Sequence, residues 1–335
     1  MNKNEYKNIL VYVEQREGKI QSVSLELISK ARELADKSKQ DVVAFIPGHE
    51  INDSYATECM KYGADKVYIY NDPLLKDYTT EAYTKASVQL INMIKPESVL
   101  FGATTIGRDL APRVSGRTHT GLTADCTSLD IDDENGNLLQ TRPAFGGNIL
   151  ATIICPNHRP QMATIRPGVM MKHILEKAKP LDVEHLKSTL VASDVNIEIL
   201  ETVKEKVEKK NITEAQILVS GGRGLGKKEN LQSLEKLAEK LGAMVSGSRA
   251  IVDAGWLDHS FQVGQTGQTV RPEVYFACGI SGAIQHVAGM EESELIIAIN
   301  KNPTAPIFEV ADVGIVGDVN QIIPLLVDEL VRMGR

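Results

Sequence analysis

The chain has 335 residues, of which 42% are hydrophobic and 24% charged, and its formal net charge at pH 7 is −7. This length exceeds one ordinary hydrophobic core and predicts two domains. The negative balance argues against a nucleic-acid-binding protein, because phosphate backbones are bound by clustered Lys and Arg. No apolar run approaches the ~18 residues of a membrane-spanning helix. The N-terminal MNKNEYKNILVYVE enters a strand pattern without a signal-peptide core, so a cytoplasmic protein is the default expectation.

The cysteines and histidines do not predict a metal site. Cys59, Cys126, Cys155 and Cys278 are isolated, with no Cys-x-x-Cys spacing for zinc or an iron–sulfur cluster. Three histidines also lack metal-ligand spacing, and we expect them to be structural or at the surface: His119, His158 and His173. We expect no metal, and cysteines that are buried thiols in a reducing compartment.

The first part of the chain alternates between strand and helix patterns. Apolar residues recur at helical spacing in 23–37, and the segments between helices are short apolar runs. Regular alternation predicts a mainly parallel sheet with helices on both faces. The expected elements are strand 8–14, helix 23–37, strand 41–47, helix 54–62, strand 66–70, helix 79–94, strand 98–102 and helix 106–117.

The pattern changes after this helix. Short strands are predicted at LTADCTSLDI (122–131), NLLQTR (137–142), ILATIIC (149–155) and QMATIR (161–166). ENGN (134–137) indicates a hairpin turn, and we expect antiparallel edge strands to be added to the sheet here. DVNIEIL (194–200) predicts a further strand.

A mixed-charge run, 201–214, then predicts a solvated helix or linker and the boundary between domains 1–205 and 206–335. The second α/β unit begins at AQILVS. Its expected elements are helix 229–241, strands 243–248 and 273–279, a helix from Ser281, strand 294–300, two short strands at 306–311 and 312–318, and helix 319–332. The expected fold class is α/β: an N-terminal parallel-sheet domain with added antiparallel strands, plus a C-terminal doubly wound domain.

The glycine cluster SGGRGLGKK (220–228) is a candidate anion-binding turn. The Gly-x-Gly-x-x-Gly dinucleotide pattern fails at its third glycine, where Lys227 stands. A P-loop fails at its last position, where Lys228 replaces the hydroxyl that would ligate Mg²⁺. What remains is a turn whose backbone N–H groups can approach an anion, with Arg223 available for a bidentate contact. A plain tight turn with a surface arginine explains this segment equally well.

Two later segments favour a ligand. GISGAIQHVAG (279–289) directly follows a strand, with Ser281 and Gly282 at the expected N-cap of a helix. GQTG (264–267) is rich in hydrogen-bonding groups and lies between the two glycine turns. Two such turns in one small domain suit a pyrophosphate, and dinucleotides bind beyond the carboxyl ends of strands in open α/β sheets.

The combined motifs resemble a known family. SGGRGLG, GSRAIVDAGW, QVGQTGQ, GISGAIQHVAGM, IIAIN and PIFEVADVGIVGD occur in this order across 215–335. Together they resemble the FAD-binding domain of the electron transfer flavoprotein α subunit, and NILVYVE and GRDLAPRVSGR resemble its N-terminal half. The resemblance implies FAD as the cofactor and a heterodimer with a β subunit. It also implies that residues 1–205 form most of the interface, and that a hinge near 201–214 lets the FAD domain swing between electron donor and acceptor.

The resemblance also assigns roles to residues, and each position carries the family's residue type. The phosphates would be contacted by Arg223, Ser248, Ser281 and Gly282, and the adenosine half by Asn300 and Asp318. The full set of cofactor-binding residues that it implies is Arg223, Ser248, Arg249, Gln262, Val263, Gly264, Gln265, Thr266, Gly267, Ser281, Gly282, Ala283, Ile284, Gln285, His286, Asn300, Asp318 and Val319.

Three of these residues would tune the redox potential of the flavin. Arg249 would lie beside the isoalloxazine, Thr266 would place its hydroxyl at N5, and His286 would reach the C2 carbonyl side. The Arg249 charge, at about 4 Å and an effective dielectric of about 20, is worth at most about 4 kcal/mol, or on the order of 100 mV. A protonated His286 and the start of its helix could add to this. Trp256 and Tyr275 could stack on a flavin, but core packing explains them better.

Residues 115–126 and 141–171 resemble the bifurcating branch of the family, which occurs in anaerobes. In that branch the β subunit oxidises NADH at a second FAD, and the electron pair is split between ferredoxin and an acyl-CoA dehydrogenase. Three residues of this chain would lie toward the partner's flavin: Arg142, Phe145 and Gly146. Any ferredoxin would be a separate protein, because the cysteines for an appended domain are absent. The alternative within the family is a simple carrier of single electrons between acyl-CoA dehydrogenases and a membrane quinone reductase.

Two alternatives come from other classes. The near-P-loop could belong to a nucleotide-binding phosphotransferase or ATPase, although Lys228 argues against it. A non-redox module that binds adenine nucleotides would be colourless. It would have no need for Arg249, Thr266 and His286 together.

Overall fold

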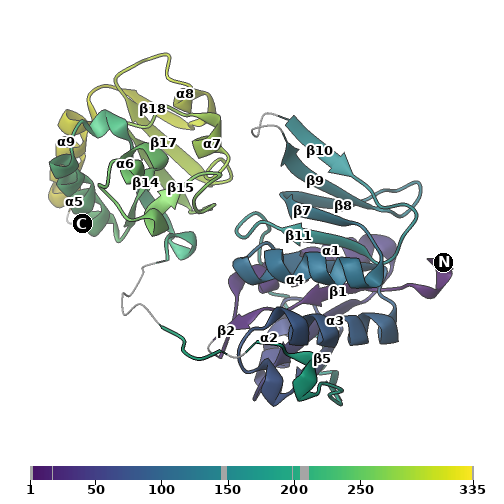
Figure 1. Ribbon diagram of the computed structural model, residues 1–335. Helices are drawn as coiled ribbons and strands as arrows, with labels where there is room; N and C mark the ends of the chain where they lie inside the picture. The colour runs from purple at the N-terminus through teal and green to yellow at the C-terminus, as the bar shows by residue number, and fades with distance from the viewer. Residues whose placement is uncertain (1–2, 17, 145–148, 198, 204–210, 334–335) are drawn as a thin grey trace. The chain divides into compact units, whose positions relative to one another are not determined.

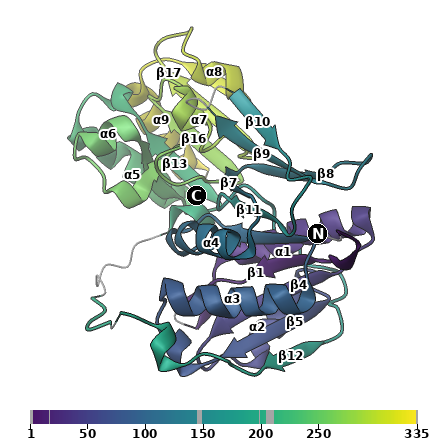
Figure 2. The ribbon, with the colours of Figure 1, turned by 45° about the vertical axis from the view of Figure 1, so that its right-hand side comes forward.

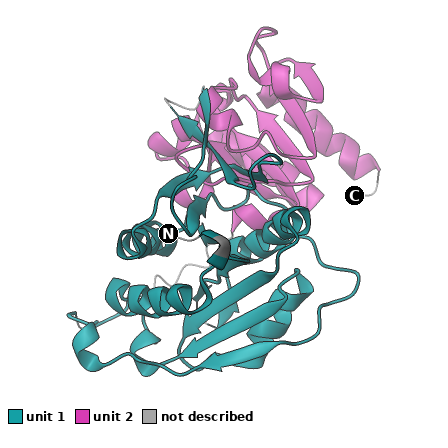
Figure 3. Cartoon of the chain, turned by 90° about the vertical axis from the view of Figure 1, so that its right-hand side faces the viewer, with its two compact units in different colours: residues 1–144, 149–204 teal, residues 145–148, 205–335 magenta. Residues whose placement is uncertain are grey.

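The computed structural model describes residues 3–16, 18–144, 149–197, 199–203 and 211–333. The chain divides into two compact units, shown in two colours in Figure 3. Unit 1 comprises residues 1–144 and 149–204, and unit 2 includes residues 205–335. None of the helices in the described ranges has both the length and the apolar character that crossing a bilayer requires.

Unit 1 is built on a seven-stranded sheet in which every neighbouring pair is parallel. In spatial order its strands are β12 (Val183–Leu186), β5 (Lys66–Asn71), β4 (Val42–Gly48), β1 (Ile9–Tyr12), β6 (Ser98–Gly102), β11 (Gln161–Ile165) and β7 (Leu122–Cys126). The helices that connect the strands are α1 (Ser22–Ser38), α2 (Asp53–Lys61), α3 (Thr80–Ile94) and α4 (Thr105–Thr118).

The two faces of this sheet form two hydrophobic cores. Ile9 and Val11 of β1 point into the core under α1 and α2, whereas Leu10 and Tyr12 point into the core under α3 and α4. Figure 2 shows α3 running across β1, β4 and β5. Burial on both faces explains why these strands are continuous apolar runs, and the predicted parallel sheet with helices on both faces is confirmed.

The antiparallel strands form a sheet of their own, in the order β10 (Ile149–Ile153), β9 (Leu138–Ala144) and β8 (Ser128–Ile131). The hairpin between β8 and β9 is confirmed, but the expectation that such strands extend the edge of the main sheet is wrong. β11 is buried along its whole length and pairs in parallel with β6 and β7, between which it lies. β10 is largely exposed and belongs to the three-stranded sheet, as Figure 1 shows. A short hairpin of β2 (Gln15–Arg16) and β3 (Lys19–Ile20) completes the sheets of unit 1.

The predicted strand at 194–200 is wrong. The described part of this segment contains no strand, and Ile197 and Ile199 are exposed. β12, which lies earlier in the chain, pairs with β5 and fills the edge of the sheet. β12 is the outermost strand of the sheet, and the described part of 194–200 does not pair with it.

Unit 2 contains a six-stranded parallel sheet. In spatial order its strands are β15 (Gln262–Val263), β14 (Met244–Ser248), β13 (Ile217–Gly221), β16 (Val274–Cys278), β17 (Leu295–Asn300) and β18 (Val313–Val316). Numbered along the unit, this is the order 3-2-1-4-5-6 of the doubly wound fold. The fold-class prediction is confirmed for both units.

The helices of unit 2 are α5 (Leu231–Leu241), α6 (Arg249–Asp253), α7 (Ile284–Val287), α8 (Ile307–Val310) and α9 (Val319–Arg332). α5 and α9 pack side by side over one face of the sheet, as Figure 1 shows. Two expectations need correction. The segment 306–311 contains the helical turn α8 instead of a strand, and the helix expected from Ser281 is the four-residue α7, with its N-cap at Ala283.

Two glycines of α4 give a test of the packing in unit 1. A Cβ on Gly107 would lie 1.8 Å from the carbonyl oxygen of Gly102, whereas a Cβ on Gly116 would meet nothing within 4 Å. We expect Gly107→Ala to lower the free energy of unfolding by about 2 kcal/mol or more, because backbone must move. Gly116→Ala, the control, should raise it by about 0.5–1 kcal/mol through helix propensity. Urea denaturation followed by circular dichroism measures both, and two changes of the same sign would contradict the packing described.

Candidate cofactor site

Unit 2 contains a cleft of about 1000 Å³ beyond the carboxyl ends of its strands. Its lining includes the residue at the end of β14, Ser248, and that at the end of β17, Asn300. It also includes the turns that follow β13 and β16, the pair of strands from which the sheet is wound in opposite directions. Ligands of open α/β sheets bind at this switch point.

The turns after β13 and β16 pack backbone against backbone. The Gly224 N–H donates to the carbonyl oxygen of Gly279 across 2.9 Å, and a Cβ on Gly224 would lie 2.7 Å from the Gly279 Cα. A Cβ on Gly222 would lie 2.4 Å from the same Gly279 oxygen. Contact between the two turns therefore accounts for glycine at these positions, whatever ligand lies above them.

The turn after β13 does not have the geometry of a P-loop. Two 3₁₀ turns, Arg223–Leu225 and Lys228–Asn230, separate the end of β13 from the first residue of α5, Leu231. The Lys228 ammonium donates to the Gly255 carbonyl. The α5 N-terminus therefore does not directly follow the glycines, and this removes the geometric support for the phosphotransferase alternative.

The GQTG loop is held against α7 by a second close backbone contact. A Cβ on Gly289 would lie 2.5 Å from the Gly264 Cα, and the Gln265 N–H donates to the Gln285 carbonyl across 2.7 Å. The Gln262 side chain donates to the Thr266 hydroxyl oxygen across 2.9 Å. Because that hydroxyl already accepts a hydrogen bond, its own proton is available to a ligand.

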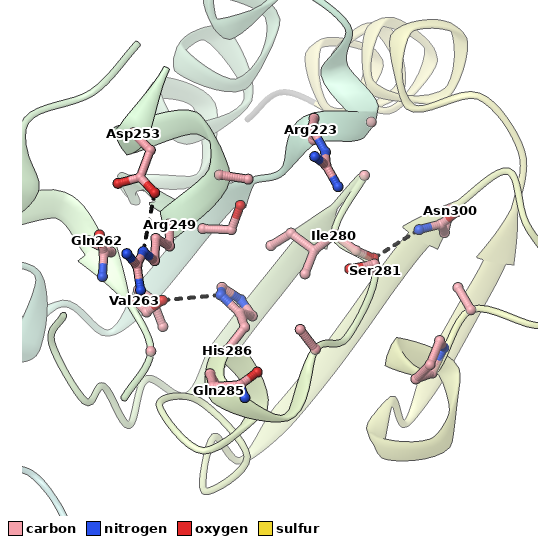
Figure 4. A pocket seen from close by; sticks show the side chains of 18 of the residues that line it. Arg223, Arg249, Asp253, Gln262, Val263, Ile280, Ser281, Gln285, His286 and Asn300 are labelled. Carbon is pink, nitrogen blue, oxygen red and sulfur yellow. Dashed lines mark hydrogen bonds and ion pairs between the residues drawn. The ribbon is translucent and has the colours of Figure 1, made fainter. Parts of the chain in front are cut away.

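His286 lies in the wall of the cleft with both ring nitrogens hydrogen-bonded, and Figure 4 shows the contact with Val263. Nδ1 is 3.1 Å from the Val263 carbonyl oxygen, and Nε2 is 2.9 Å from the Tyr275 hydroxyl. Burial lowers the pKa of His286 to about 4. The ring is therefore neutral at pH 7 in this arrangement, and the condition for an added positive charge, a protonated His286, is not met. α7 has only four residues, so its dipole also adds little.

Cationic side chains gather on the same cleft. Arg223, Arg249 and Lys301 all line it and are exposed. Arg249 Nε lies 3.1 Å from an Asp253 carboxylate oxygen, an i,i+4 pair on α6. Within the part of the chain that the structure describes, Arg223 and Lys301 have no carboxylate partner. The cleft therefore carries a net positive charge, which suits a pyrophosphate.

Asn300 braces two of the turns that form the cleft. Its side-chain amide donates to the Ile280 carbonyl across 2.8 Å, as Figure 4 shows, and its oxygen accepts from the Asn302 N–H across 2.9 Å. The turn after β16 is thereby tied to the turn after β17. Gly282 contributes to the same junction, because a Cβ there would lie 2.1 Å from the Ile307 nitrogen.

Most of the residues that the sequence singled out meet in this cleft. Those that line it are Arg223, Ser248, Arg249, Gln262, Val263, Gly264, Thr266, Ser281, Ala283, Gln285, His286 and Asn300. Those that do not line it are Gln265, Gly267, Gly282, Ile284, Asp318 and Val319. Asp318 caps α9 by accepting from the Asn320 N–H, and Val319 is buried in the core.

The sequence analysis missed several residues of the cleft. They are Gly224, Gly226, Ala250, Asp253, Gly279, Ile280, Lys301, Asn302, Ala305 and Pro306. Asp253 had a signal, because it stands four residues after Arg249 in a short helical pattern. The others come from turns whose approach depends on the tertiary fold. Trp256 and Tyr275 pack in the hydrophobic cores, as expected.

The described residues contain no candidate metal or cluster site. No group of His, Cys, Asp and Glu there is arranged to hold a metal ion. The four cysteines are free, and Cys59, Cys126 and Cys278 are buried. Phe145 and Gly146, two residues expected near a partner's flavin, lie outside the described residues.

The fold and the cleft define a dinucleotide-binding protein. The sheet has the order 3-2-1-4-5-6, the cleft volume is near the upper end of ligand pockets, and Arg223 and Lys301 have no carboxylate partner among the described residues. Comparison with protein families gives the particular class. Residues 9–191 match the electron transfer flavoprotein domain, and residues 211–291 match the electron transfer flavoprotein FAD-binding domain. The chain belongs to the electron transfer flavoprotein family as an α-subunit-type member, and its cofactor is FAD.

Individual relatives agree with the family match. The chain is 52% identical to the electron transfer flavoprotein subunit alpha of Thermoanaerobacterium thermosaccharolyticum, over 98% of this chain and 99% of that one. It is 47% identical to the acryloyl-CoA reductase electron transfer subunit beta of Anaerotignum propionicum (98% and 96%). It is 45% identical to the lactate dehydrogenase (NAD(+),ferredoxin) subunit LctC of Acetobacterium woodii (97% and 77%). A solved benzoylformate decarboxylase from Polynucleobacter necessarius aligns with 97% of this chain and 58% of its own at 12% identity, but its TM-score of 0.21 supports no argument.

The neutral His286 predicts how the stability of unit 2 depends on pH. The unfolded chain takes up this proton near pH 6.5 and the folded chain near pH 4, so protonation favours unfolding. The neutral His286 therefore contributes to the free energy of unfolding fully above pH 6.5, and this contribution is lost as the pH falls to 4. The total loss is about 3 kcal/mol. Trp256 is the chain's one tryptophan, so its fluorescence reports the unfolding of unit 2.

The comparison is between the wild type and His286→Gln at fixed flavin content. The variant should lack this part of the pH dependence between 6.5 and 4, whatever its absolute stability. Parallel pH profiles for the two proteins would show that His286 is not held neutral.

Proposed function

We propose that the chain is the α subunit of a heterodimeric electron transfer flavoprotein. It holds FAD in the cleft of unit 2 and passes single electrons between a flavin of the β subunit and an acyl-CoA dehydrogenase. The observation that carries this proposal is the meeting of Arg223, Arg249, Thr266 and His286 in one cleft of a chain of this family. The flavin supplies the redox chemistry when bound, and the protein supplies binding, orientation and electrostatics.

The cleft offers separate groups for the two ends of the cofactor. The pyrophosphate would be held by Arg223 and Lys301, two exposed cations that have no carboxylate partner in the described ranges, and by the hydroxyls of Ser248 and Ser281. Asn300 would serve the adenosine half mainly by fixing the turns around it. Asp318 and Val319 do not line the cleft, and their contact with adenosine stays a prediction.

The isoalloxazine end would be served by Arg249, Thr266 and His286. The Nε of Arg249 is committed to Asp253, which leaves its terminal amino groups for the ligand. Thr266 has a hydroxyl proton to donate. His286 supplies a neutral ring, so Arg249 is the principal positive charge at this end, and Asp253 partly offsets it.

We also propose that the complex carries out NADH-dependent electron bifurcation with ferredoxin. Two relatives support this by name: one belongs to an acryloyl-CoA reductase, and the other to a lactate dehydrogenase that uses NAD(+) and ferredoxin. Residues 115–126 and 141–171 resemble the same branch. In the latter segment, Arg142 on β9 has a buried Nε–H without a hydrogen-bond partner among the described residues. The simple carrier remains the second candidate.

Unit 1 is the proposed surface for the β subunit. It exposes several large apolar side chains on and just after β10: Ile149, Leu150, Ile153 and Ile154. Apolar groups that cluster in this way typify interaction surfaces. The segment 201–214 is the proposed hinge between the two domains, and its residues 204–210 lie outside the described ranges.

The first test is the visible spectrum of the chain purified with its β subunit during stepwise reduction with NADH. We expect two FAD per heterodimer, and flavin bands that bleach with NADH. One flavin that ignores NADH but accepts electrons from an acyl-CoA dehydrogenase would leave the simple carrier. A colourless complex that takes up no FAD would refute the proposal as a whole.

A second test concerns the charge at the isoalloxazine end. Arg249→Ala should lower the first reduction potential of the flavin by at most on the order of 100 mV, less after solvent screening, because a positive charge is removed. Asp253→Asn, the matched variant, should raise it because the opposing charge is removed from the same helix. Potentiometric titration of both variants measures this, and shifts of the same sign would contradict the electrostatic role.

A further inference from the structure

A cluster of buried hydroxyl groups lies behind His286. Tyr275 on β16, Ser220 on β13 and Ser246 on β14 are all fully buried. Ser220 stands opposite Ser246 in one strand pair and opposite Ala277, two residues from Tyr275, in the other. Because side chains alternate along a strand, the three hydroxyls share one face of the sheet.

The partners of His286 fix where its proton lies. A carbonyl oxygen only accepts hydrogen bonds, so the contact with Val263 requires a proton on Nδ1. In the neutral ring Nε2 then carries no proton and accepts, and the group beside it is the Tyr275 hydroxyl. That hydroxyl has a single proton, which is committed to His286.

The hydrogen bonds around His286 run one way, from the Tyr275 hydroxyl to Nε2 and from the Nδ1 proton to the Val263 carbonyl. The Tyr275 oxygen keeps acceptor capacity after it donates to His286. Ser220 and Ser246 lie on the same face of the sheet as Tyr275, and neither serine hydroxyl has a hydrogen-bond partner among the described residues.

We propose that Tyr275 is a positioning residue of the cofactor site: it holds His286 in the tautomer with its proton on Nδ1 and ties that proton to Val263. That the tautomer of His286 matters for flavin binding rests on the proposed function. Val263 begins the loop that carries Thr266. Through the His286 ring, Tyr275 therefore supports two side chains at the isoalloxazine end, His286 and Thr266. Tyr275 does not line the cleft.

The arrangement also limits what His286 can offer a ligand. Both ring nitrogens are engaged by the protein, so the ring offers the cleft no free N–H. A ligand carbonyl that takes a hydrogen bond from His286 must displace Val263, or displace Tyr275 and move the ring proton to Nε2. The Tyr275 contact therefore sets which hydrogen bonds a flavin can form here.

The experiment is NMR of the full chain without FAD, with ¹⁵N-labelled histidine rings. The chain has seven histidines, and the signal lost in His286→Gln identifies His286. We expect a single tautomer in the wild type, with the proton on Nδ1. Tyr275→Phe should produce a mixture of tautomers, and the control Tyr83→Phe, which removes a buried hydroxyl bonded to the Leu75 carbonyl, should change nothing at His286.

Two results would overturn the proposal. One is a wild-type ring with its proton on Nε2, which needs no variant to fold. The other is an unchanged His286 spectrum in Tyr275→Phe.

A double-mutant cycle on FAD affinity connects the tautomer to the cofactor. Tyr275→Phe should weaken FAD binding roughly three- to tenfold in the wild type, and less than about twofold in His286→Gln, because its effect passes through the ring. Equal changes in both backgrounds would reduce Tyr275 to a structural role and overturn the proposal. If the wild type bound no FAD, the proposed function would fail, and the NMR result on the FAD-free chain would still stand or fall on its own.

Discussion

The cofactor cleft of unit 2 depends on contact between backbones at the ends of parallel strands. Gly224 packs on Gly279, and Gly264 packs on Gly289, at distances that admit no Cβ atom. Such contacts hold the turns after β13 and β16, and the GQTG loop against α7, in a fixed arrangement. Side chains that are far apart in the sequence then face one cleft without touching each other directly. A larger residue at these glycines would therefore disturb the site even though its own side chain bound nothing.

The electrostatics of the cleft differ between its two ends. Arg223 and Lys301 are exposed and lack carboxylate partners in the described ranges, which suits a pyrophosphate that carries fixed negative charge. At the other end, Arg249 is paired with Asp253, and His286 is neutral because burial opposes its protonation. The first end has charge for binding, and the second has a smaller net charge that can modulate a potential. A site of this kind separates the affinity for the cofactor from its redox tuning.

The sequence predicted those features that depend on local pattern. Buried strands with helices between them were predicted within a few residues, because β1 and α1 have a clear periodicity that burial on both faces explains. Errors occurred where pairing decided the outcome. Residues 194–200 have a strand pattern, but β12 takes the place beside β5. Segment 306–311 contains the helical turn α8, against which Gly282 packs. The two glycines that match the dinucleotide fingerprint, Gly222 and Gly224, also have a tertiary role, because both pack against Gly279.

In the cofactor site, too, the sequence predicted which residues are present but not the protonation state of His286. Arg249, Thr266 and His286 were found by motif, and all three line the cleft. The charge of His286 could not be found that way, because it depends on burial and on a carbonyl and a hydroxyl that come from two other strands. Tyr275 looked like a core residue and is one, yet its single polar atom meets His286. A buried tyrosine hydroxyl beside a ligand-facing histidine is thus both core packing and part of the site, because the sheet that forms the core also positions the ring.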